Sequence, residues 1–131
     1  MSSEPILIRV YGRPAPQGSK RYLGAGRMIE SSRYVGQWRQ DVIASIMPAQ
    51  KQHLAAPVSL SIVFFLRRPK KRKSWTWHGV RPDLSKLIRA TEDALVDAGV
   101  LTDDCFISVL CAAKVYHDEP GAHITVRLIT E

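Results

Sequence analysis

The sequence predicts an α/β fold of the α+β type, in which a small mixed β-sheet of about four strands is covered by two helices. Two observations support this prediction: four segments are rich in β-branched or aromatic residues, and two others carry apolar residues at helical spacing. With 131 residues, 45% of them hydrophobic, the chain is long enough for one packed core. We therefore expect residues 1–131 to form a single domain.

The first half of the chain predicts a strand, a loop and a helix in that order. Residues 6–13 (ILIRVYGR) are rich in β-branched and apolar side chains, whereas residues 13–27 have the Pro and Gly density of a loop. Apolar residues at helical spacing then predict a helix that begins near Ser31 or Ser32 and ends before Pro48.

A second strand, a basic loop and a second helix follow. Residues 57–68 alternate apolar side chains on one face, as a strand does, and residues 67–82 show no apolar period and are expected to be an exposed loop. Pro82 and Gly99 suit the two ends of the helix between them. Its apolar face is given by Leu84, Leu87, Ile88, Thr91, Leu95 and Ala98.

The C-terminal part predicts two strands, residues 105–117 and 122–130, joined by the turn DEPG and expected to pair antiparallel. Cys105 and Cys111 are too far apart along a strand to bridge, so we expect free thiols. No apolar run reaches 18 residues and the N-terminal segment lacks the features of a secretory signal. These absences favour a cytoplasmic protein with no membrane contact.

Charge is unevenly distributed along this basic chain, whose formal net charge is +7. Residues 1–82 carry 15 Lys and Arg against three acids, a net +12, whereas residues 83–131 carry four against nine, a net −5. A basic body with an acidic centre suits a protein that holds a polyphosphate with one part and a divalent cation with another. The alternative is a basic protein with scattered, solvated acids.

Half of the acids lie between residues 81 and 105, where Asp83 precedes the second helix and Asp103 and Asp104 follow it. The two ends of such a helix are about 20 Å apart. These acids can therefore meet only if the following strand carries Asp104 back along the helix. As alternatives, Asp83 could be a helix N-cap and the Asp pair could be turn residues.

Residues 82–107 (PDLSKLIRATEDALVDAGVLTDDCFI) resemble the signature of the RusA family of Holliday junction resolvases. That signature is approximately P-D-hydrophobic-D-N-hydrophobic, then Lys, D-A-L, a Gly, and D-D before a hydrophobic strand. The upstream RPAPQGSKR and RMIESS also resemble phage-type members. The resemblance implies a homodimeric, Mg²⁺-dependent endodeoxyribonuclease, with Mn²⁺ as an alternative metal. It would resolve four-way DNA junctions by paired symmetric nicks in DNA recombination and repair, within the nucleoid of a bacterial or phage-infected cell.

Matched to the family pattern, Asp83 falls on the first metal-binding Asp, Asp104 on the third, and Arg89 on the catalytic Lys. Ser85 stands where a second catalytic Asp is expected, and Lys86 stands in place of the Asn. Mg²⁺ commonly takes one or two protein carboxylates together with substrate phosphates. We therefore expect Asp83, Asp104 and a Ser85 oxygen to hold the metal once DNA is bound. The alternative for Ser85, which is the commoner role of a serine at this position, is an ordinary first-turn residue.

Basic residues in the two expected loops and in the second helix are predicted to bind DNA phosphates without reading bases. Trp75 and Trp77 follow the most basic run and could stack on unpaired bases or serve as core or dimer contacts. The predicted phosphate contacts are Lys20, Arg21, Arg67, Arg68, Lys70, Lys71, Arg72, Lys73 and Lys86.

Two other functions fit the same sequence. The substitution at Ser85 could leave a junction-binding protein of the same fold with impaired cleavage. Alternatively, the chain could be a basic nucleic-acid-binding adaptor whose acids are only caps and turns.

Overall fold

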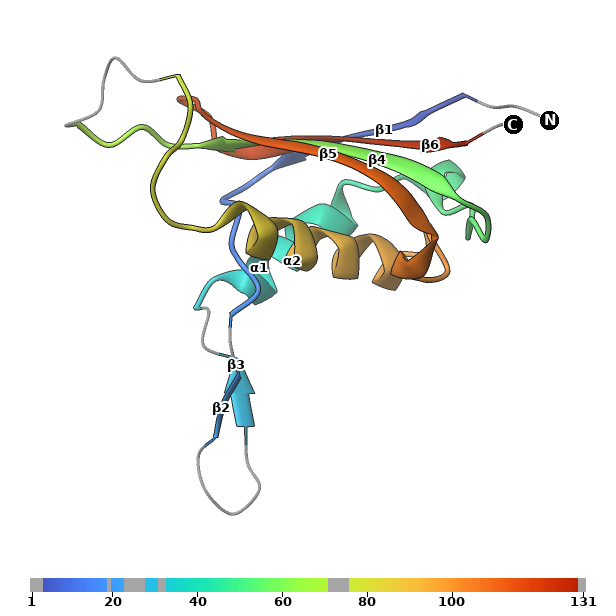
Figure 1. The fold of residues 1–131 in the computed structure, drawn as a ribbon, viewed down its shortest axis with the longest axis horizontal. Coiled ribbons are helices and arrows are strands. Elements are labelled where there is room, and N and C mark those ends of the chain that lie inside the picture. Colours follow the sequence, from blue (N-terminus) through green and yellow to red (C-terminus); the bar gives the residue numbers. More distant parts are fainter. Residues whose placement is uncertain (1–3, 19, 23–27, 31–32, 71–75, 130–131) are drawn as a thin grey trace.

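The computed structural model describes residues 4–18, 20–22, 28–30, 33–70 and 76–129 (Figure 1). A four-stranded sheet forms one layer and two α-helices form the other, both against the same face of the sheet. The mixed sheet and its two helices confirm the predicted α+β fold. No helix in these described ranges has the length and apolar character needed to span a lipid bilayer.

Strand β4 (Val58–Leu66) lies inside the sheet, whose order is β1 (Ile6–Tyr11), β6 (Gly121–Leu128), β4 and β5 (Ile107–Tyr116). It pairs antiparallel with β6 and parallel with β5. Every second residue of β4 is buried against the helices. The side chains between them are half-buried. The central position of β4 therefore removes apolar surface from solvent on both of its faces.

The prediction that the last two strands pair with each other is wrong. β5 and β6 run in opposite directions, but β4 separates them. A turn of four residues favours a hairpin, but burial of the apolar β4 between its neighbours outweighs this local preference.

A short antiparallel ribbon, β2 (Lys20–Tyr22) with β3 (Met28–Glu30), lies within the segment predicted to be a loop. In Figure 1 this ribbon extends away from the sheet and the helices. Its strands are only three residues long, too short for an alternation of apolar residues to be read from the sequence.

Helix α1 (Val35–Ala44) begins later than predicted, with Tyr34 at its N-cap position. Helix α2 (Leu84–Asp97) ends as predicted, because Gly99 follows it with a φ of +85°, which glycine adopts without strain. Two short 3₁₀ turns complete the fold, η1 (Pro48–Gln50) and η3 (Asp104–Phe106).

The two helices meet in the core through a buried hydrogen bond. Trp38 of α1 is fully buried, and its indole Nε1 donates to the Thr91 hydroxyl of α2 over 3.1 Å. The same hydroxyl donates to the Leu87 carbonyl over 2.9 Å. Because a buried polar group without a partner is costly, this pair fixes how α1 lies against α2.

Replacing Thr91 by Val keeps the shape of the side chain but leaves the Trp38 N–H without an acceptor. We expect Thr91→Val to lower the free energy of unfolding by about 1–3 kcal/mol, measured by urea denaturation. Thr91→Ser, which keeps the hydroxyl, is the control and should lose less. A Thr91→Val variant as stable as the parent would contradict this role.

Candidate active site

Asp83 occupies the N-cap position of α2, but its side chain does not cap the helix. Its carboxylate lies 3.9 Å from the Lys86 ammonium, and the Asp83 side chain is 58% exposed. Asp83 is therefore at the N-cap position, as the alternative predicted, but its carboxylate accepts no hydrogen bond from the helix N-terminus. An exposed carboxylate that makes no cap bond is free to contact a ligand.

Lys114 of β5 holds the segment that leads into α2. Its ammonium donates to the backbone carbonyls of Val80 and Pro82, each over 2.8 Å. Burial lowers the pKa of Lys114, and the nearby Asp83 carboxylate partly offsets this effect. Lys114 thus fixes the chain immediately before Asp83.

Lys114 was not among the site residues predicted from the sequence, although its position on β5 marks it as unusual. In the pairing with β4, Lys114 is opposite the buried Phe64 and therefore faces the helices. A lysine on the inward face of an otherwise apolar strand needs a local partner, and such a position is a candidate functional residue.

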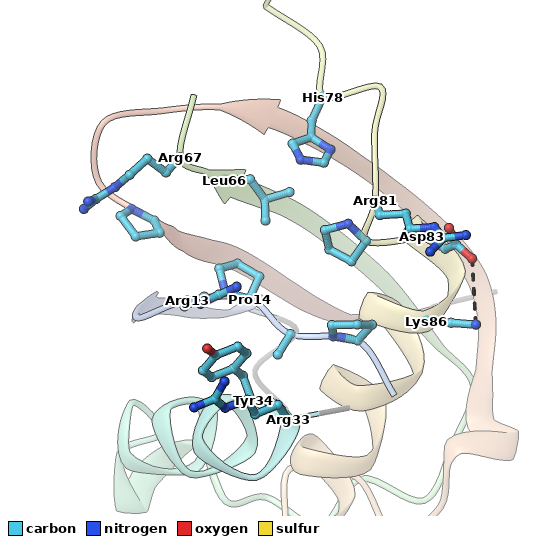
Figure 2. A pocket seen from close by; sticks show the side chains of 14 residues that line it. Arg13, Pro14, Arg33, Tyr34, Leu66, Arg67, His78, Arg81, Asp83 and Lys86 are labelled. Atoms are coloured by element: carbon cyan, nitrogen blue, oxygen red, sulfur yellow. Dashed lines mark ion pairs between the residues drawn. The ribbon is translucent and has the colours of Figure 1, made fainter. Parts of the chain in front are cut away.

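Asp83 lies on the wall of a recess of about 990 Å³ between the end of β1, the start of α1 and the segment before α2. We name it the arginine recess. In Figure 2 the chain segments that carry these side chains surround one open space, with the Asp83–Lys86 pair at one side. Its cationic lining residues are Arg13, Arg33, Arg67, Arg81 and Lys86, and its apolar lining includes Pro14, Ala15, Leu66, Pro82 and Pro120.

Positive charge in the arginine recess is poorly compensated. The Arg13 guanidinium lies 3.9 Å from the Tyr34 ring centroid and that of Arg33 lies 5.4 Å from it, so two like charges gather at one ring. Among the described residues, the only ion pair in this recess is Lys86 with Asp83. A recess with five cations and one carboxylate is suited to an anion such as a phosphate.

His78 also lines the recess, and its lowered pKa favours the neutral imidazole. It is only 8% exposed, and burial, followed by the charge of Lys114, lowers its pKa. In Figure 2 its ring is directed toward the interior of the recess. The cationic character of the site therefore comes from arginine and lysine.

The other acids gather at the opposite end of α2, in a smaller recess of about 290 Å³ lined by Arg39, Asp93, Val96, Asp97, Asp103 and Asp104. Asp93 pairs with Arg39 of α1, at 3.4 Å. Asp93 therefore links the two helices.

Asp103 and Asp104 behave differently although they are adjacent. The Asp103 carboxylate accepts a hydrogen bond from the Cys105 N–H over 2.8 Å, which lowers the pKa of Asp103 and confirms a turn role for this residue. The interaction with Asp103 raises the pKa of Asp104, whose exposed side chain stands in η3. Both carboxyl groups are exposed, and that of Asp104 interacts with that of Asp103.

Asp83 and Asp104 do not meet within one chain. They flank opposite ends of α2, a helix about 20 Å long, and η3 lies beside its C-terminal end (Figure 1). Strand β5 does run back along the helix, but Asp104 precedes β5 and lies in η3, near the C-terminal end of α2. The return that would bring the two acids together does not occur.

These residues do not fit a complete metal site. In the described part of the chain, no three His, Cys, Asp or Glu side chains lie close enough together to hold a metal ion. Asp83 has two ammonium groups as neighbours, from Lys86 and Lys114. Ser85 and Arg89 are both exposed on α2.

The predicted DNA contacts are only partly gathered at the arginine recess. Arg67 and Lys86 line it, whereas the Arg68 guanidinium lies 5.4 Å from the Tyr116 ring centroid and Lys70 is exposed. Lys20 and Arg21 belong to β2, and the predictions that fall outside the described residues are Lys71, Arg72, Lys73 and Trp75.

Two other predictions have a structural outcome. Trp77 is exposed, beside its bridge partner Val115, so the core alternative for this residue is wrong. The prediction of free thiols at Cys105 and Cys111 is confirmed, and both side chains are exposed.

Three recess arginines were missed because they are isolated in the sequence. Arg13 ends the first predicted strand segment, Arg33 precedes α1, and Arg81 precedes Pro82. Clusters of basic residues attract attention in a sequence, whereas the fold alone brings these three to one cavity.

A cationic recess beside an exposed carboxylate is suited to a protein that binds polyanionic chains such as nucleic acids. A family model described as Endodeoxyribonuclease RusA matches residues 11–127, and the chain belongs to this family. The Crossover junction endodeoxyribonuclease rusA of Lactococcus phage r1t is 31% identical over 70 residues, which are 53% of each chain. The chain thus matches about half the length of this curated relative.

Glu92 provides a test of the electrostatics at the acidic end of α2. Burial, followed by the carboxylates of Asp104 and Asp93, raises its pKa. The folded state therefore favours neutral Glu92, and the charged form costs stability at neutral pH. We expect Glu92→Gln to raise the melting temperature at pH 7 by about 2 °C.

This gain should disappear near pH 4, as wild-type Glu92 becomes protonated when the pH falls through its folded pKa. Thermal melts of both proteins between pH 4 and pH 8 measure the difference. A gain that is constant with pH, or a loss at pH 7, would contradict the assignment.

Proposed function

We propose that this protein is a structure-selective endodeoxyribonuclease, a single RusA-like domain that resolves four-way DNA junctions by paired symmetric nicks. The observation that carries the proposal is the position of Asp83. This carboxylate belongs to the segment that matches the family signature, makes no helix cap, and lines the arginine recess. The family match over residues 11–127 and the printed name of the phage relative support the same activity.

The chain's own residues would bind and orient the DNA backbone. Guanidinium groups of Arg13, Arg33, Arg67 and Arg81 would hold a phosphate in the recess through paired hydrogen bonds. Lys86 and Arg89 would add positive charge near the bond that is cut, where negative charge develops. Arg89 is always charged, so we assign it no proton transfer.

We propose that cleavage depends on Mg²⁺, with Mn²⁺ as an alternative, and that Asp83, Asp104 and Ser85 are the candidate ligands. Because Asp83 and Asp104 lie at opposite ends of α2, one chain would not bring both to the same ion, and the metal would need ligands from the DNA as well. Metal affinity in the absence of DNA should therefore be weak.

We also propose that the protein acts as a homodimer on four-way junction DNA, in the cytoplasm at the nucleoid of a bacterial or phage-infected cell. A two-fold symmetric protein presents two equivalent sites, as two symmetric nicks require. Phosphate contacts from arginine and lysine should make DNA binding steeply dependent on salt.

A junction-binding protein with impaired cleavage is the second candidate. It is favoured by the serine at position 85, which is exposed on α2 and offers a hydroxyl in place of a carboxylate. If this candidate is correct, Ser85→Asp would produce cleavage in a protein that otherwise only binds. A basic adaptor, the third reading, would show no preference for junctions over linear duplex.

The test is a nicking assay on a labelled four-way junction and the matching linear duplex, with Mg²⁺, with Mn²⁺ and with chelator. We expect metal-dependent cuts in the junction alone. Asp83→Asn and Asp104→Asn should each reduce the rate by a factor on the order of 100 or more while junction binding is kept.

Asp118→Asn, which changes an exposed carboxylate in the turn before β6, is the control and should cut at the wild-type rate. Tight junction binding without cuts in any metal would reject the nuclease and leave the impaired binder. Equal affinity for junction and duplex would reject both.

A further inference from the structure

The arginine recess is larger than a phosphate group requires. Its volume of about 990 Å³ lies at the upper end of the range of about 300–1,000 Å³ that is typical of sites for whole small molecules. One water molecule accounts for about 30 Å³ in the liquid, and a phosphate group is only a few times larger. The recess therefore has room for a complete nucleotide.

Part of the wall of the recess is apolar and rigid. The lining includes Pro14, Pro16, Pro82 and Pro120. A proline ring fixes its own backbone φ and carries no N–H, so these residues present apolar rings whose positions change little when a ligand enters. An apolar wall does not stabilise a phosphate, whereas it does stabilise the face of a nucleobase.

Tyr34 adds an aromatic ring to the same lining. It stands at the N-cap position of α1, and 40% of its surface is exposed. The Arg13 guanidinium lies 3.9 Å from the centroid of the Tyr34 ring, so a planar cation lies over a planar ring. Bases of any sequence stack on aromatic side chains, and arginine adds a cation–π contribution. Tyr34 and Arg13 together are therefore suited to hold a base.

A polar side chain without a partner faces Tyr34 across the recess. His78 is 8% exposed, and in Figure 2 its ring and that of Tyr34 lie on opposite sides of the open space. The buried His78 Nδ1 makes no hydrogen bond within the described residues. A neutral imidazole has one donor and one acceptor nitrogen, as the edge of a base has, whereas the recess arginines only donate. His78 is thus suited to meet the edge of a base.

We propose that the arginine recess accepts one unpaired nucleotide of the junction, with its phosphate on the recess cations and its base between Tyr34 and His78. This inference rests on the proposed function for its substrate and names the part of that substrate that enters the site. Taking a base out of a continuous duplex breaks its pairing and stacking, and costs least where these are already disturbed, as at a branch point. The recess thereby favours a junction over a linear duplex.

Binding of small nucleotides tests the recess without any cleavage. Deoxyribose 5-phosphate and the four deoxynucleoside 5′-monophosphates are titrated into the protein, and binding is followed by NMR. Because stacking of the base adds to the phosphate contacts, we expect at least one nucleotide to bind at least about fivefold tighter than deoxyribose 5-phosphate. Equal binding of all the compounds, or binding of none, would overturn the proposal.

Substitutions at Tyr34 locate the base. Tyr34→Ala should remove the advantage of the nucleotides and leave the affinity for deoxyribose 5-phosphate largely unchanged, whereas Tyr34→Phe, which keeps the ring, should retain that advantage. Arg81→Gln should weaken the binding of every compound. Tyr11→Ala is the matched control, because Tyr11 is a 72% exposed tyrosine that does not line the recess, and it should behave as wild type. A Tyr34→Ala protein that still prefers nucleotides would contradict the assignment.

Junctions that lack one base test the same contact in DNA. Affinity is measured in the presence of chelator for a series of four-way junctions, each abasic at one position beside the branch point. For the wild-type protein, loss of one particular base should weaken binding at least about fivefold, and Tyr34→Ala should bind that junction as tightly as the intact one. A wild-type protein that binds every junction in the series equally would overturn the inference.

The inference and the proposed function can fail separately. A wild-type protein that cuts junctions but shows no preference for nucleotides over deoxyribose 5-phosphate would leave the nuclease standing and overturn the inference. A protein that prefers nucleotides through Tyr34 but cuts no junction would remove the nuclease and keep the recess as a nucleotide site.

Discussion

The arrangement of the candidate site depends on one charged contact between the sheet and the chain that enters α2. The Lys114 ammonium, carried by an edge strand, holds the Val80 and Pro82 carbonyls and so sets where α2 begins. Asp83 follows directly, and Arg81 is part of the same held segment. A lysine that donates to two carbonyls at 2.8 Å, with a carboxylate nearby, is a fixed element of structure. The geometry at the rim of the arginine recess follows from this contact.

The fold places the basic recess and the acidic recess at opposite ends of α2, although the residues around this helix are close together in the sequence. α2 carries Asp83 at one end and leads to Asp104 at the other, so the basic and acidic recesses are divided by the length of a helix. A phosphate would be bound at the basic end, where five cations face one carboxylate. Among the described residues, Arg39 is the one cation that lines the acidic recess.

Local features were predictable from the sequence, and features that depend on the assembly of distant segments were not. The end of α2 at Gly99 was predicted because a left-handed residue after a helix is a local requirement. The order of the strands was not, since it depends on how deeply β4 is buried relative to its neighbours. The arginine recess was missed for the same reason, because Arg13, Arg33 and Arg81 come from separate segments. The family resemblance identified Asp83 and Asp104, but only the fold shows that one chain keeps them apart.

We propose that the phosphate to be cut is bound in the arginine recess beside Asp83. The most direct measurement is a crystal structure of the Asp83→Asn variant with a four-way junction. We expect a backbone phosphate in the recess, hydrogen bonded to Arg13, Arg33 or Arg81. A junction bound across the uncovered face of the sheet, with no phosphate in the recess, would contradict it.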